Sequence, residues 1–218
     1  LAHEIKNPLT PIQLTIDRLK SKYSHELNEK NSENFKENLK IINNQIKQIE
    51  KLVNEFSDFA RMPKPILRKN NLISLINENI KLLSELDKSI NKNFKFYVDK
   101  VFLECDNEQL SRVFLNLIKN SIESIQEKSQ NSSNYNKNIT IELIDNHSQI
   151  NITIEDNGIG FSNSNKNVKE LLNPYITTKK NGTGLGLSIV NKIVNDHNGK
   201  IEFIPSDEGA KIKISFVR

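Results

Sequence analysis

Two stretches of the first 60 residues, which contain no glycine, carry apolar residues at alternating spacings of four and three. The first stretch comprises Ile5, Leu9, Ile12, Ile16, Leu19 and Tyr23, and the second comprises Phe35, Leu39, Ile42, Ile46, Ile49, Val53 and Phe56. This heptad spacing is typical of helices that pack as a left-handed bundle. The polar stretch 24–32 predicts the loop between them, so we expect a helical hairpin.

A hairpin of two such helices leaves one apolar stripe exposed on each helix. A second copy of the chain would cover these stripes and complete a dimeric four-helix bundle. The alternative is that the hairpin packs on the C-terminal part of its own chain.

The prolines of Met62–Pro65 end the helical pattern, because proline lacks the amide donor and restricts the residue before it. Beyond them the periodicity changes between helical and alternating. Helices are predicted at 72–86, 108–125 and 185–194, strands at 94–98, 102–105, 139–144, 150–154, 200–204 and 211–217, and loops at 126–137 and 162–181. We therefore expect a second domain over residues 63–218, a helix-and-sheet sandwich of the α+β type.

Composition narrows the function classes. The net charge is +4 and the pI is about 9.0, but the basic residues form no block and no aromatic residues are interleaved with them, so we expect no nucleic-acid partner. The single cysteine, Cys105, indicates a reducing compartment. The sequence has no apolar run of membrane-spanning length. Because the first residue is Leu1 rather than Met, we expect a piece of a longer protein.

Glycine is scarce, with 7 residues in 218, and five of them fall at 158–160 and 182–186. Asp156 ends a predicted strand just before Gly158 and Gly160, where its carboxylate could accept a hydrogen bond from an exocyclic amine. The stretch Gly182–Gly186 opens a predicted helix, whose free amides attract phosphate oxygens. It matches neither the P-loop nor the dinucleotide-binding pattern. Either stretch alone could be a turn with a helix cap.

Two amide side chains, Asn116 and Asn120, lie four residues apart and therefore on one helix face. Amide oxygens suit a hard cation such as Mg²⁺. Lys119 and Lys179 could neutralise phosphate charge. In a chain this rich in asparagine, such a pair also arises by chance.

The segment that begins with Leu1 places His3 and Asn7 on one helical face, away from the apolar seam. An exposed, near-neutral imidazole is a competent nucleophile toward phosphorus, and Glu4 could accept its proton. The alternative is an ordinary solvated surface histidine.

In their order along the chain, these motifs resemble the transmitter region of sensor histidine kinases, and in detail the nitrogen-regulation, NtrY-like branch. The H box corresponds to His3–Thr10, the N box to Leu110–Ser124, and the F box to Asn173–Lys179, with Tyr175 in the aromatic place. The glycine boxes correspond to Asp156–Gly160 and Gly182–Leu187. The departures are Ser121 after the second asparagine and Asn173 before the proline.

The resemblance implies a dimerisation and phosphotransfer hairpin over 1–62 and a Bergerat-type (GHKL) ATP-binding domain over 63–218. His3 would take the γ-phosphate of ATP, with Glu4 and Asn7 beside it, and pass it to an aspartate in the receiver domain of a response regulator. Asn7 would position water in a phosphatase reaction. Nucleotide ligands would be Asn116, Lys119, Asn120, Asp156, Gly158, Gly160, Tyr175, Thr178, Lys179, Gly182, Thr183, Gly184, Leu185, Gly186 and Leu187, and Mg²⁺ would bind Asn116 and Asn120.

The resemblance also implies a homodimer that forms the cytoplasmic portion of an inner-membrane sensor, with a membrane anchor upstream. Two alternatives stay open. One is a GHKL-type ATPase that hydrolyses ATP directly, although no glutamate lies four residues before Asn120. The other is an ATP-binding pseudokinase scaffold, although neither the histidine, the asparagines nor the glycine boxes are missing.

Overall fold

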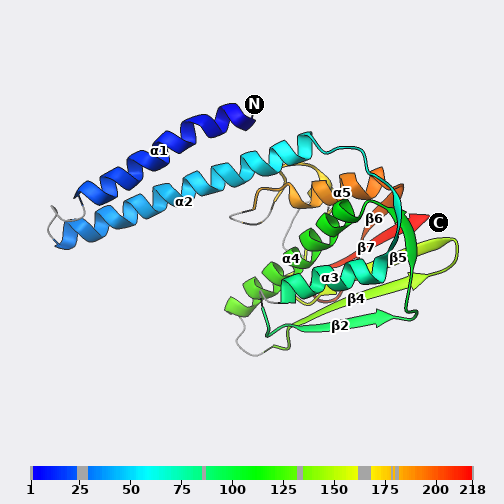
Figure 1. The fold of residues 1–218 in the computed structure, drawn as a ribbon. Helices are drawn as coiled ribbons and strands as arrows, with labels where there is room; N and C mark the ends of the chain where they lie inside the picture. The colour runs from blue at the N-terminus through cyan, green and yellow to red at the C-terminus, as the bar shows by residue number, and fades with distance from the viewer. Residues whose placement is uncertain are drawn as a thin grey trace. The chain divides into compact units, whose positions relative to one another are not determined.

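The computed structural model describes residues 2–23, 29–84, 87–131, 135–161, 168–177, 179 and 182–217. Contacts divide the chain into two compact units, 1–62 and 63–218. Figure 1 draws the first unit in blue to cyan and the second in the remaining colours.

The first unit is a hairpin of α1 (Ala2–Tyr23) and α2 (Glu29–Ala60). One row of each heptad seam packs inside it. This core contains Leu9, Ile16, Leu39 and Ile46, with Phe35 against it. The second row is exposed: Ile12, Leu19, Ile42 and Ile49 have exposed fractions of 37–45%. Each helix thus buries one apolar row and leaves another uncovered, which is the arrangement that a four-helix bundle requires.

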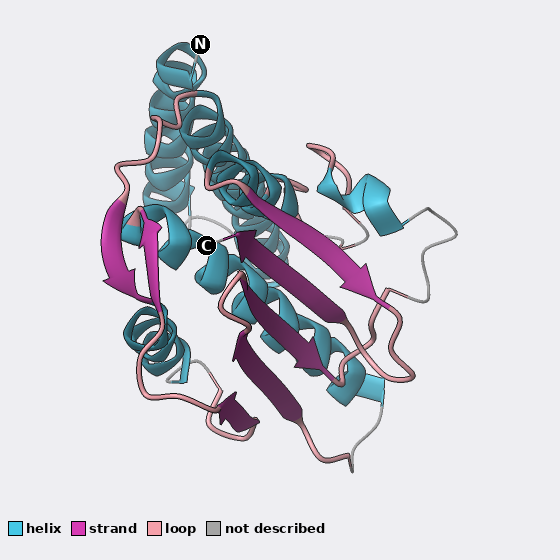
Figure 2. Cartoon of the chain, turned by 90° about the vertical axis from the view of Figure 1, so that its right-hand side faces the viewer, coloured by secondary structure: helices cyan, strands magenta, loops and turns pink. Residues whose placement is uncertain are grey.

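The second unit contains a five-stranded sheet in the order β2-β4-β5-β7-β6. The strands are β2 (Asn91–Phe96), β4 (Asn138–Asp145), β5 (Gln149–Asp156), β6 (Gly199–Ile204) and β7 (Lys211–Val217). Only the β2–β4 pair is parallel among the strand pairs of this sheet. The helices α3 (Leu72–Ser84), α4 (Asn107–Asn131) and α5 (Gly186–Asp196) lie on one face (Figures 1 and 2). The predicted α+β sandwich is therefore confirmed.

Side chains along β5 show how the sheet meets these helices. Ile150, Ile152 and Ile154 have exposed fractions of 3% or less, whereas the residues between them are only partly buried. Such alternation is expected for a sheet with one face on the core and one face toward solvent. Because Asp156 continues this buried row at the end of the strand, its carboxylate points to the helix side of the sheet.

A two-stranded ladder of β1 (Arg68–Asn71) and β3 (Phe102–Cys105) stands apart from the large sheet (Figure 2). The β3 strand was predicted, but β1 was not. The polar sequence of β1 lacks apolar alternation, and backbone pairing with β3 holds it in place, together with a 2.9 Å hydrogen bond from Asn70 Nδ2 to the Cys105 carbonyl.

Two predicted loops contain helix. The predicted loop over 126–137 is wrong at its start, because α4 continues to Asn131. The residues after Ile125 are polar, and most of them are good helix formers, so the helix continues here without an apolar stripe. In the predicted loop over 162–181, residues Val168–Leu172 form the 3₁₀ helix η1, with Leu171 buried. A 3₁₀ helix of five residues is too short to give a periodicity.

The chain that enters the second unit is held against α4. The Pro63 carbonyl accepts a 3.0 Å hydrogen bond from Gln109 Nε2, and the Ile66 amide donates to Asp106 Oδ2 at 2.9 Å. His197, at the end of α5, accepts from the Asp106 amide through Nε2 at 3.0 Å. From Pro63 onward, the chain is therefore bound to the second unit by these hydrogen bonds.

Among the described helices, none combines the length and the apolar character that a membrane crossing needs.

Candidate functional site

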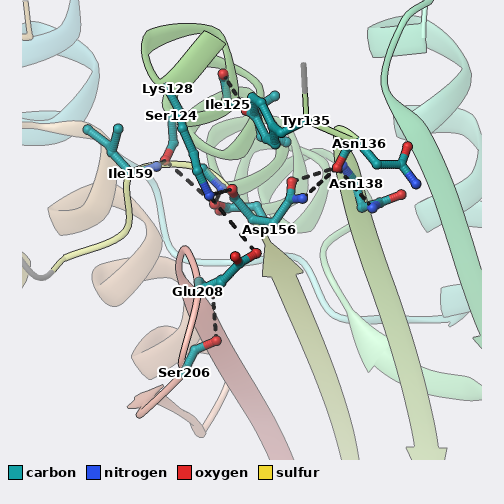
Figure 3. Close-up of polar contacts among 12 residues, drawn as sticks. Ser124, Ile125, Lys128, Tyr135, Asn136, Asn138, Asp156, Ile159, Ser206 and Glu208 are labelled. Carbon is teal, nitrogen blue, oxygen red and sulfur yellow. Dashed lines mark hydrogen bonds and ion pairs between the residues drawn. The ribbon is translucent and has the colours of Figure 1, made fainter. Parts of the chain in front are cut away.

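The carboxylate of Asp156 is buried at the end of β5, with an exposed fraction of 4%. Its Oδ1 accepts hydrogen bonds from the amides of Gly158 at 2.9 Å and Ala210 at 3.3 Å, and from Ser124 Oγ at 3.5 Å. Burial raises the pKa of Asp156, and these hydrogen bonds partly oppose the shift. Figure 3 shows the carboxylate beside Ser124 of α4. The fold thus supplies a fixed, buried acceptor.

Two hydrogen bonds hold the loop after Asp156 against α4. The Ile159 amide donates to Ser124 Oγ at 3.0 Å, and Lys128 Nζ donates to the Asn157 carbonyl at 2.8 Å (Figure 3). Lys128 also lies 4.0 Å from Glu208 in the turn between β6 and β7. The helix, the strand end and this turn therefore meet around one carboxylate.

Close approach explains the glycines of this loop. A Cβ at Gly158 would lie 2.6 Å from the carbonyl carbon of Ser124 and 2.7 Å from the amide nitrogen of Ile125. Gly160, with φ of +67°, and Gly209, with φ of +66°, face each other, and a side chain on Gly209 would collide with the Asp156 carbonyl. Only glycine lets these backbones pack so closely.

Replacing Gly158 by alanine should lower the free energy of unfolding by about 1–3 kcal/mol, because backbone atoms of α4 cannot move aside for the new Cβ. Thermal or urea unfolding followed by circular dichroism measures the loss. Gly186→Ala is the matched control, since its Cβ would meet only the movable Asn116 Oδ1, at 3.3 Å. Equal stability of the Gly158→Ala variant and the wild type would contradict the predicted overlap.

The second glycine stretch leads into α5 at an end without a side-chain cap. The N-cap residue is Leu185, which makes no side-chain capping hydrogen bond. Gly184 has φ of +71°, and its carbonyl accepts a 3.1 Å hydrogen bond from the Tyr175 amide, so the F-box segment lies against the glycines. An uncapped helix N-terminus can bind an anion through its free amides. Leu185 itself is fully buried, so only its backbone could contact a ligand.

The asparagine pair of α4 lies beside these glycines. A Cβ on Gly186 would lie 3.3 Å from Asn116 Oδ1, and Asn116 Nδ2 donates to the Arg112 carbonyl at 2.8 Å. Asn120 Oδ1 accepts a 2.9 Å hydrogen bond from Lys179 Nζ. The structure therefore brings together residues that lie up to 70 positions apart in the sequence.

Glu123 also belongs to this site, and the sequence reasoning missed it. Its Oε2 lies 2.5 Å from Lys179 Nζ, and its Oε1 lies 4.0 Å from Lys119 Nζ. The sequence could have indicated it, because Glu123 lies seven residues after Asn116 and three after Asn120. At these spacings it shares their helix face.

The side-chain oxygens of Asn120 and Glu123 suit a hard divalent cation. Asn120 Oδ1 and Glu123 Oε2 both contact one ammonium group, so two oxygens already converge on a positive charge. Within the described ranges, no group of three or more His, Cys, Asp and Glu could hold a metal ion. Mg²⁺ in nucleotide sites takes only one or two protein ligands beside substrate phosphates, so this donor set fits.

For the other predicted site residues, the structure describes the side chains of some but not of others. Tyr175 and the side chain of Lys119 are each about half exposed. Thr178 lies outside the described residues. His3, Glu4 and Asn7 belong to α1, but their side chains lie outside the described part, so their roles stay predictions.

Comparisons with known proteins agree with this architecture. Residues 1–65 match the His Kinase A (phospho-acceptor) domain, and residues 105–218 match the histidine kinase-, DNA gyrase B-, and HSP90-like ATPase family. An NtrY-like sensor histidine kinase of Rickettsia prowazekii is 37% identical over 217 residues, which cover 99% of this chain and 35% of that protein. The nitrogen regulation protein NtrY of Azorhizobium caulinodans is 34% identical, over 99% of this chain and 28% of its own.

Among solved structures, histidine kinase ThkA in complex with response regulator protein TrrA is 26% identical to this chain. It aligns with a TM-score of 0.67 over 99% of this chain and 59% of that one.

The chain belongs to the histidine kinase-, DNA gyrase B- and HSP90-like ATPase family, and a His Kinase A phospho-acceptor domain precedes its ATPase domain. The predicted resemblance to the NtrY-like branch is confirmed. The chain spans about a third of the length of the first curated relatives that it matches, at 33% and 35%.

Proposed function

We propose that the chain transfers the γ-phosphoryl group of ATP to His3 and then to an aspartate in the receiver domain of a response regulator. The observation that carries this proposal is the joint placement of the buried Asp156, the uncapped start of α5 and the Asn120–Lys179 contact in one domain. The relative ThkA forms a complex with a response regulator protein. Uptake of label from γ-labelled ATP, and its loss in a His3→Ala variant, test the proposal.

Each part of the site has one role toward ATP. Asp156, whose carboxylate is buried, accepts a hydrogen bond from the adenine amine. The amides that begin α5, with the ammonium of Lys179, receive phosphate oxygens. Bound Mg²⁺ supplies charge neutralisation at the phosphates. Positioning and charge stabilisation of this kind provide most of the catalysis in phosphoryl transfer.

The transfer itself uses residues of α1. A ring nitrogen of His3 forms a bond to the γ-phosphorus as the bond from that phosphorus to the bridging oxygen breaks, and ADP leaves with the electron pair. Glu4 takes the ring proton or holds the productive tautomer. In the second step the phosphoryl group passes from the histidine nitrogen to a carboxylate oxygen of the regulator.

The two steps require motion between the units, because His3 belongs to the first unit and the described nucleotide residues belong to the second. α2 ends at Ala60, whereas Pro63 and Ile66 are anchored to α4 through Gln109 and Asp106. The hinge is therefore proposed for the residues just before Pro63, at the start of the predicted junction Met62–Pro65.

A homodimer is part of this proposal, since Ile42 and Ile49 of α2 are 45% and 43% exposed. Replacing both by lysine should convert the dimer into a monomer, because charged side chains cannot be buried in the bundle interior. Sedimentation measures the mass, and circular dichroism checks that helix is retained. Asn44→Lys, at an exposed polar position of the same helix, should stay dimeric. A double lysine variant that is still dimeric would refute this interface.

Phosphatase activity toward the regulator, with Asn7 positioning water, stays a prediction. The upstream membrane anchor and the cytoplasmic position at an inner membrane stay predictions as well.

A further inference from the structure

The ammonium group of Lys179 lies between two oxygens of α4. Its Nζ is 2.9 Å from Asn120 Oδ1 and 2.5 Å from Glu123 Oε2. The side chains of Lys179 and Glu123 are only partly exposed, at 30% and 41%. One amide oxygen and one carboxylate oxygen therefore share a single positive charge at the margin of the site.

The backbone around Lys179 brings this charge from the segment that precedes the phosphate-binding glycines. The Lys179 amide donates to Thr177 Oγ1 at 3.1 Å, and its carbonyl accepts from the Gly182 amide at 3.2 Å. Gly182 is packed so tightly that a Cβ would lie 2.5 Å from Thr177 Oγ1 and 3.1 Å from Lys179 Cβ. These contacts hold the backbone of Lys179 beside Thr177 and Gly182.

We propose that Asn120 and Glu123 form the divalent-cation position of the nucleotide site, and that Lys179 stands in for the cation when no nucleotide is bound. The proposal rests on the proposed function, since it assigns the metal that accompanies ATP. It adds Glu123 as a ligand residue, acting directly or through a water molecule, to the asparagines predicted from the sequence.

Charge and space support this exchange. An ammonium group and a divalent cation cannot occupy the same two oxygens, so binding of one excludes the other. Phosphate oxygens at the start of α5 offer Lys179 a stronger partner than an amide oxygen. When Lys179 moves to them, the carboxylate of Glu123 loses its closest counter-charge, because Lys119 lies 4.0 Å away on a more exposed side chain. A divalent cation bound in its place restores positive charge beside this carboxylate.

The alternative is that Glu123 only anchors Lys179. The two readings differ in what the charge of Glu123 does for the metal. As a ligand, Glu123 strengthens metal binding and leaves metal-free nucleotide binding nearly unchanged. As an anchor, it restrains Lys179, so its removal releases the ammonium toward phosphate and strengthens metal-free nucleotide binding.

The experiment uses Mn²⁺ and ADP as probes on the whole chain, in the wild type and in the Glu123→Gln, Lys179→Met and Glu127→Gln variants. Free Mn²⁺ is followed by electron paramagnetic resonance with and without saturating ADP, and metal-free ADP affinity by calorimetry. Glu127 is the matched control, because it removes the same charge one turn along α4 at an exposed position. Unfolding midpoints check that each variant is folded.

We expect Glu123→Gln to weaken Mn²⁺ binding in the presence of ADP by about tenfold, with metal-free ADP affinity within about twofold of wild type. Lys179→Met should tighten Mn²⁺ binding without nucleotide, since its competitor is gone, and Glu127→Gln should change neither. Unchanged Mn²⁺ affinity in Glu123→Gln, with tighter metal-free ADP binding, would overturn the cation position and leave the proposed function standing. A wild type that binds no ADP with or without Mn²⁺ would instead overturn the proposed function, and this inference with it.

Discussion

Replacing His3 by alanine should abolish the uptake of label from γ-labelled ATP, while ATP binding stays as in the wild type. The reason is that the variant lacks the nitrogen that attacks the γ-phosphorus, whereas the nucleotide residues lie in the other compact unit. Alanine is also the best helix former, so α1 should be retained. Autoradiography of the purified chain measures the label, and calorimetry with an ATP analogue measures binding.

His147→Asn is the matched control for this variant. His147 is exposed in the turn between β4 and β5 and has φ of +64°, a conformation that asparagine tolerates. It should take up label as the wild type does. Full labelling of the His3→Ala variant would mean that another residue receives the phosphoryl group.

Asp156→Ala should weaken ATP binding by about ten- to a hundredfold, because a buried charged acceptor for the adenine amine is worth about 1.5–3 kcal/mol. Calorimetry or displacement of a fluorescent nucleotide measures the loss. The variant also leaves the amides of Gly158 and Ala210 without their acceptor, so its stability must be checked by circular dichroism. Asp156→Asn keeps the shape but turns one acceptor into a donor that faces the amine, and it should lose affinity similarly. Wild-type affinity in both variants would remove Asp156 from the site.

The pH dependence of ATP binding offers a further check on this residue. Because burial raises the pKa of Asp156, protonation begins at a higher pH than for an exposed aspartate. ATP affinity should therefore fall as the pH is lowered through that raised pKa, and the Asp156→Asn profile should lack this step. The sign for stability is opposite: the burial penalty of the ionised carboxylate, present at neutral pH, disappears as the pH falls through the same range.

The elements with strong apolar periodicity could be predicted from the sequence. The strands after 138 and the strand Phe102–Cys105 fall close to where they were predicted, and β4 and β5 bury every second side chain as their alternation indicates. β1 could not be predicted, since its four polar residues owe their conformation to backbone pairing with β3. The end of α4 could not be predicted, because its last residues are polar and give no apolar stripe.

For the site, too, some features could be predicted from local sequence and others only from the folded chain. Local spacing was sufficient to place Asn116 and Asn120 on one face and Asp156 at a strand end. The Glu123–Lys179 ion pair joins residues 56 positions apart, so only the folded chain places them together. Gly209, in the turn between β6 and β7, is another such case, because its need for glycine comes from the backbone of Asp156 at the end of β5.

The most direct test of the proposed phosphotransfer is to measure whether the phosphate on the wild-type chain survives acid and alkali, and which residue carries it. The chain is incubated with γ-labelled ATP and Mg²⁺, split into acid-treated and alkali-treated portions, and digested with trypsin for peptide mapping. We expect label that is lost in acid, survives alkali and maps to the peptide ending at Lys6, whose one histidine is His3. Label that survives acid, or that maps to a peptide without His3, would contradict phosphorylation of this histidine.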